Sequence, residues 1–103
     1  MSSENKGYTE AKPQELKALR ESIDSIDEKL VPLLKQRMEC SLEIAKVKKS
    51  LSLPVYHPER EREILNNVKL SGGEYGEYIE KIYTSIMAES RNLQNEILTE
   101  NEK

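Results

Sequence analysis

The stretch from Pro13 to Leu51 constrains this chain most, because apolar residues recur along it every three or four positions. Counted in heptads from Leu16, the a and d positions form a seam of Leu16, Leu19, Ile23, Ile26, Leu30, Leu33, Arg37, Cys40, Ile44, Val47 and Leu51. So regular a seam predicts one long helix that packs against other helices. Arg37 is the one charged seam residue, and a guanidinium there is costly unless an anion meets it.

Composition narrows the class of protein further. The chain has 103 residues, no Trp and no Phe, and it is rich in Leu, Ile, Glu, Lys and Gln, so we expect one all-α domain with an aliphatic core. A net charge of −3 without a basic block argues against nucleic-acid and membrane-surface partners.

The single cysteine excludes an internal disulfide and favours a reducing, cytoplasmic location. We expect Cys40, which falls on the seam, to be a small buried core residue. The sequence contains no signal peptide, no transmembrane run and no Cys/His cluster, so we expect neither a membrane nor a metal site.

Prolines and glycines divide the chain into three expected helices between two tails. Residues 1–12 form a polar tail that we expect to be disordered, and residues 99–103 a frayed one, which leaves a domain over 13–98. The first helix runs from 13 to about 50, continuous but kinked at Pro32. The second runs from Pro58 to about Leu70 with Ile64, Leu65 and Val68 inward. The third follows the turn 71–76 and spans about 74–98.

Several polar residues fall on faces that should be apolar. Arg37 and Lys48 lie about 16 Å apart along the first helix with only about 20° of rotation between them. Glu61, preceded by Arg60, lies on the inner edge of the second helix, and Ser90 and Gln94 interrupt the apolar stripe of the third. Each also has an ordinary structural interpretation, such as a core ion pair, a solvated charge run or a local hydrogen bond. Together they indicate a pocket for a small dianion.

The order and spacing of these pieces resemble the all-helical chorismate mutases over residues 16 to 98. The most specific are LRESIDSIDEKL at 19–30, the Arg37 and Lys48 spacing, PVYHPERE at 54–61, and Ser90 with Gln94. The resemblance implies conversion of chorismate to prephenate in aromatic amino acid biosynthesis, the shikimate pathway, without a cofactor. By resemblance, Arg20 and Arg37 grip the two carboxylates and Lys48 and Gln94 donate to the ether oxygen. Glu61 accepts from the ring hydroxyl, and Arg60 and Ser90 complete the shell. Some members carry Asp where His57 stands, so His57 either contacts the substrate or only caps the helix.

Arg20 has a geometric consequence. It precedes Lys48 by 28 residues, about 42 Å along one helix, which no chorismate-sized ligand spans. If both serve one site, Arg20 must come from a second chain whose long helix runs antiparallel. The unpartnered seam requires such a chain in any case. We therefore expect an intertwined homodimer with two sites.

Two alternatives stay open at this point. An isochorismate-pyruvate lyase uses the same scaffold, but a relative of that kind lacks the carboxylate that corresponds to Glu61. A non-catalytic helical dimerisation or regulatory module has no reason to keep Arg37 on its seam. A synthase of the aromatic pathway is a further candidate partner.

Overall fold

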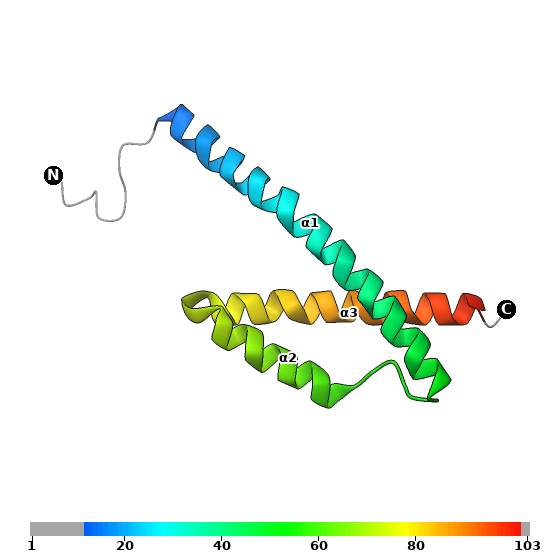
Figure 1. Ribbon diagram of the computed structural model, residues 1–103. Coiled ribbons are helices and arrows are strands. Elements are labelled where there is room, and N and C mark those ends of the chain that lie inside the picture. Colours follow the sequence, from blue (N-terminus) through cyan, green and yellow to red (C-terminus); the bar gives the residue numbers. More distant parts are fainter. Residues whose placement is uncertain (1–11, 102–103) are drawn as a thin grey trace. The chain divides into compact units, whose positions relative to one another are not determined.

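The computed structural model describes residues 12–101. They form three α-helices, α1 (Pro13–Ser50), α2 (Pro58–Ser71) and α3 (Gly76–Asn101), with one 3₁₀ turn, η2 (Gly73–Tyr75), between the last two (Figure 1). No strand occurs within these residues, which confirms the all-α prediction.

Helix α1 has the bounds that its seam predicts. Pro13 occupies the start of the helix, where a missing N–H costs nothing. Lys48 and Lys49 lie in the last turn, where their positive charges interact favourably with the negative end of the helix dipole. The helix is continuous through Pro32, as predicted, while the kink stays a prediction. The chain divides within this helix into two units, one ending at Lys35 and one beginning at Gln36.

The first unit leaves its seam open to solvent. Its apolar seam side chains are between 46% and 65% exposed: Leu16, Leu19, Ile23, Ile26, Leu30 and Leu33. Full burial of one such side chain stabilises a fold by about 1.5–3 kcal/mol. A row of six therefore represents a large stabilisation that this unit by itself does not gain.

In the second unit, the buried face of α1 is not the predicted seam. Ser41 and Ala45, one turn apart, are buried, whereas the seam residues Ile44 and Val47 are more than half exposed. Cys40 is exposed too, so its expected burial is wrong for the chain by itself. Small side chains let neighbouring helices approach closely, and the larger seam residues remain free for another partner.

Helix α1 ends in a Schellman motif. The Leu53 N–H donates to the Lys48 carbonyl (2.7 Å) and the Ser52 N–H to the Lys49 carbonyl (3.1 Å). Ser52 has a φ of 58°, the left-handed region that usually requires glycine. This turn directs the following connection, residues 51–57, back toward the side chain of Lys48.

We expect Ser52→Gly to stabilise the protein by roughly 0.5–1 kcal/mol, because glycine adopts this positive φ without the steric cost of a Cβ. Urea unfolding followed by circular dichroism measures the change. Ser50→Gly, which adds a glycine within α1, is the matched control and should destabilise the protein. A destabilised Ser52→Gly variant would mean that the serine side chain itself holds this turn.

Helices α2 and α3 form a hairpin around η2 (Figure 1). A Cβ added at Gly76 would lie 2.2 Å from the Lys69 carbonyl oxygen, so only glycine allows this close approach. Helix α3 begins at Gly76 rather than at 74, because η2 occupies the preceding residues, and it extends to Asn101 rather than ending at Leu98. Residues 99–101 are thus part of α3, while fraying of the tail 99–103 stays a prediction. The predicted tail at 1–12 lies outside the described residues except for Lys12, as do residues 102–103.

Candidate functional site

A pocket of about 530 Å³ lies in the second unit, between the C-terminal part of α1, the connection 51–57, α2 and α3. Seven of the eight residues singled out from the sequence line it: Arg37, Lys48, His57, Arg60, Glu61, Ser90 and Gln94. Arg20 is not among the lining residues. The pocket has the size of a site for a small organic molecule.

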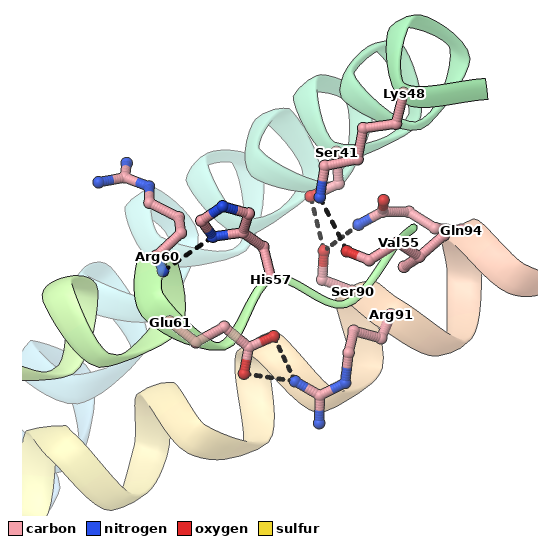
Figure 2. A network of polar contacts seen from close by, with 9 residues as sticks. All are labelled: Ser41, Lys48, Val55, His57, Arg60, Glu61, Ser90, Arg91 and Gln94. Atoms are coloured by element: carbon pink, nitrogen blue, oxygen red, sulfur yellow. Dashed lines mark hydrogen bonds and ion pairs between the residues drawn. The ribbon is translucent and has the colours of Figure 1, made fainter. Parts of the chain in front are cut away.

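Lys48 is positioned by the connection that follows its own helix. Its Nζ donates a 2.8 Å hydrogen bond to the Val55 carbonyl oxygen, and the contact is partly buried (Figure 2). An ammonium group has three donors, so two remain for a ligand. The bond fixes a long side chain that would otherwise have many rotamers.

A buried chain of three polar side chains connects α1 to α3. The Ser90 hydroxyl donates to the Ser41 Oγ (2.7 Å), and the Gln94 Nε2 donates to the Ser90 Oγ (3.2 Å) (Figure 2). The Gln94 Oε1 is buried and has no hydrogen-bond partner among the described residues. A buried carbonyl oxygen without a donor costs about 1–3 kcal/mol, so this amide is poised to gain from a polar ligand. Ser41 was missed from the sequence, because a serine on a long helix gives no signal of its own.

The start of α2 forms the mouth of the pocket. His57 is the N-cap residue, and its Nδ1 accepts a 3.0 Å hydrogen bond from the Arg60 backbone N–H (Figure 2). Because Nδ1 accepts, the neutral ring carries its proton on Nε2. His57 therefore caps the helix and still has a donor available. The Arg60 guanidinium pairs with Glu63 one turn away and is largely exposed.

Glu61 makes an ion pair that the sequence did not reveal. The Arg91 Nη1 donates to both carboxylate oxygens of Glu61, and both side chains are partly buried (Figure 2). Arg91 lies four residues after the buried Met87 and three before the buried Gln94. Those spacings predict a position at the edge of the inward face of α3, and this is the signal in the sequence that points to Arg91.

Within residues 12–101, the cations that line the pocket outnumber the one lining carboxylate. Arg37, Lys48, Arg60 and Arg91 line it together with Glu61. Arg37 is half-buried, and its Cζ lies 5.6 Å from the centre of the Tyr83 ring, a cation–π distance. An excess of positive charge at a concave site favours an anionic ligand.

Comparison with known proteins identifies the family. The sequence model of the chorismate mutase type II family matches residues 19–95. The chain belongs to the chorismate mutase type II family. This settles the resemblance that the sequence motifs indicate.

Relatives of this chorismate mutase family member are larger proteins. It is 37% identical over 90 residues to a bifunctional chorismate mutase/prephenate dehydratase of Aquifex aeolicus, a match that covers 82% of this chain and 25% of the relative. It is 38% identical over 85 residues to a T-protein of Enterobacter agglomerans, covering 80% and 23% respectively. The chain thus spans about a quarter of the length of these curated relatives.

A solved structure has the same fold as this chorismate mutase family chain. A conserved hypothetical protein from Pyrococcus furiosus superposes with a TM-score of 0.64 at 36% sequence identity, over 82% of this chain and 99% of that one. None of the helices within residues 12–101 combines the length and the hydrophobicity of a transmembrane span. No group of three or more His, Cys, Asp or Glu side chains that could hold a metal ion occurs in the same part of the chain.

Proposed function

We propose that the chain is a chorismate mutase, which rearranges chorismate to prephenate for the biosynthesis of phenylalanine and tyrosine. The observation that carries the proposal is the convergence of Lys48 from α1 and Gln94 from α3 on one pocket that also holds Glu61. Membership of the family supports the same reaction. The rearrangement is intramolecular, so the protein must hold a reactive conformer and stabilise the charge that develops on the breaking ether bond.

Within this proposal, each side of the substrate meets a suitable partner. Arg37 grips a carboxylate with its planar fork, and Arg60 and Ser90 complete the shell around the substrate. The ring hydroxyl donates to Glu61 and contacts His57 near the mouth. A negative charge at Glu61 is the feature that favours the mutase over the isochorismate-pyruvate lyase.

Lys48 and Gln94 are the donors to the ether oxygen. The two ends of the Gln94 amide have nearly the same shape, and a half-turn exchanges them. After that turn, Oε1 accepts from the Ser90 hydroxyl, Ser90 accepts from the Ser41 hydroxyl, and Nε2 faces the pocket. Rotation of two hydroxyl groups and one amide therefore satisfies the buried Oε1 and supplies a donor where the ether oxygen binds.

Gln94→Glu should confine activity to acidic pH, because a carboxylic acid donates a hydrogen bond to the ether oxygen only when it is protonated. We expect kcat/KM at neutral pH to fall by about 10²–10³-fold, the effect of losing one donor to a developing oxyanion. The measurement is the kcat/KM profile from about pH 5 to about pH 8. Gln94→Leu, which has no donor at any pH, should show this loss at every pH, and a Gln94→Glu profile parallel to wild type would contradict the assignment.

A second copy of the chain completes the site in this proposal. The exposed seam from Leu16 to Leu33 matches what two antiparallel copies of α1 would bury against each other. Arg20 is exposed and flanks that seam, one residue after Leu19. In an antiparallel pair it reaches the pocket of the partner and grips the second carboxylate. The cytoplasmic location and a partner synthase remain predictions.

Incubation of the purified chain with chorismate tests the proposed function directly. Loss of the chorismate absorbance with formation of prephenate, identified by its acid conversion to phenylpyruvate, is the expected result. Release of pyruvate and salicylate from isochorismate would instead assign the lyase. If the chain consumes neither compound, it is a non-catalytic helical module.

A further inference from the structure

We infer that Arg91 is a positioning residue, which holds the Glu61 carboxylate in the orientation that accepts the ring hydroxyl of the substrate. The inference rests on the proposed function and adds to it a residue that neither the sequence motifs nor the proposed substrate contacts include. The observation behind it is the ion pair that Arg91 of α3 makes with Glu61 of α2.

The Glu61–Arg91 pair differs from two other ion pairs of the chain. Lys46–Glu43 and Arg60–Glu63 each join residues three apart on one helix, and their side chains are about 60–70% exposed. Arg91 and Glu61 come from different helices, and their side chains are only 32% and 22% exposed. Surface pairs within one helix contribute little, whereas a partly buried pair between elements fixes both side chains.

The geometry leaves Glu61 able to accept from a ligand. A single nitrogen of Arg91 bridges both carboxylate oxygens, and a carboxylate has about four acceptor sites. The outer sites of both oxygens therefore remain available to a hydroxyl group. Because Arg91 already restricts the rotamers of Glu61, less conformational entropy is lost when substrate binds.

Arg91 also answers an electrostatic problem. A dianionic substrate repels a carboxylate in the same pocket, and the adjacent guanidinium offsets that repulsion. The guanidinium is itself held in place, because its Cζ lies 5.1 Å from the centre of the Tyr56 ring. Tyr56 directly precedes the N-cap residue His57, so the connection, α2 and α3 meet at this pair.

The test compares chorismate with an analogue that lacks the ring hydroxyl. With chorismate, Arg91→Met should lower kcat/KM by about 10- to 100-fold, as misplacement of a functional group does. With the analogue, wild type and Arg91→Met should agree within about twofold, because the contact that Glu61 makes is absent from both. Arg62→Met removes an exposed arginine of α2 that does not line the pocket, and it should match wild type on both substrates.

A double-mutant cycle separates positioning from a direct or purely structural role. If Arg91 acts through Glu61, Arg91→Met should add no further loss in a Glu61→Gln background. Arg91→Lys, which keeps the charge but not the planar guanidinium that contacts Tyr56, should give an intermediate loss and carries the test if Arg91→Met fails to fold.

Equal losses on chorismate and the analogue, or losses that multiply in the cycle, would overturn the inference while leaving the proposed function intact. A wild-type chain that forms no prephenate would overturn both.

Discussion

Lys48→Ala should lower kcat/KM by about 10²–10³-fold or more while the protein stays folded. Among the described residues that line the pocket, Lys48 supplies the one ammonium group, and a charged donor to a developing oxyanion is typically worth a few kcal/mol of transition-state stabilisation. The substitution also removes the hydrogen bond to the Val55 carbonyl, so we expect a small loss of stability, about 1 kcal/mol. Steady-state kinetics with chorismate and urea unfolding measure the two effects.

Lys49→Ala is the matched control, because Lys49 is the next residue of α1 and is exposed. It removes the same charge from the same helix end and should leave kcat/KM within about twofold. If Lys48→Ala also stays within twofold, Lys48 is only a tether for the connection 51–57, and the proposed mechanism loses its principal donor.

Arg20→Ala should lower kcat/KM by about 100-fold, although nothing in the environment of Arg20 within its own chain would suggest it. The side chain is exposed, and removal of an exposed arginine ordinarily changes little. The expected loss arises because Arg20 completes the partner's site with a charge-assisted grip on a carboxylate. The loss is measured by steady-state kinetics at a protein concentration at which the dimer is fully formed. Sedimentation confirms the oligomeric state.

Lys17→Ala controls for loss of charge near the N-terminus of α1. Lys17 is exposed and lies in the b position of the heptads, away from the seam. The Lys17→Ala variant should be as active as wild type. An Arg20→Ala variant with full activity would assign the second carboxylate to another cation, such as Arg60.

The helices could be predicted from the sequence because each leaves a strong local signal. Seam spacing gives α1 from Pro13 to Ser50, and Pro58 marks the start of α2. The predicted start of α3 at residue 74 lies two residues before the observed one, because residues 73–75 form a 3₁₀ turn whose composition resembles a first helical turn. The left-handed Ser52 could not be foreseen, because a serine carries no signature of positive φ.

The residues of the pocket could be predicted because polar side chains on apolar stripes are conspicuous. Their partners could not, because periodicity shows which face is inward and leaves open what that face meets. Thus Ser41, which bonds Ser90, and Arg91, which bonds Glu61, became visible only in the structure. The same limit explains the misread face of α1, where small Ser41 and Ala45 are buried and the seam residue Ile44 is exposed.

The most direct test of the account is to mix Arg20→Ala with Lys48→Ala, unfold the two chains together and refold them. Random pairing makes about half of the dimers mixed, and one of the two sites in each mixed dimer then has both residues. Arg37→Ala mixed with Lys48→Ala is the control, because both residues line the pocket of one chain and no mixed site has both.

We predict that the first mixture recovers about a quarter of wild-type activity at equal total protein, given independent sites, and that the control recovers none. If the first mixture also recovers none although heterodimers are demonstrated, Arg20 does not serve the partner's site and the shared-site account is wrong.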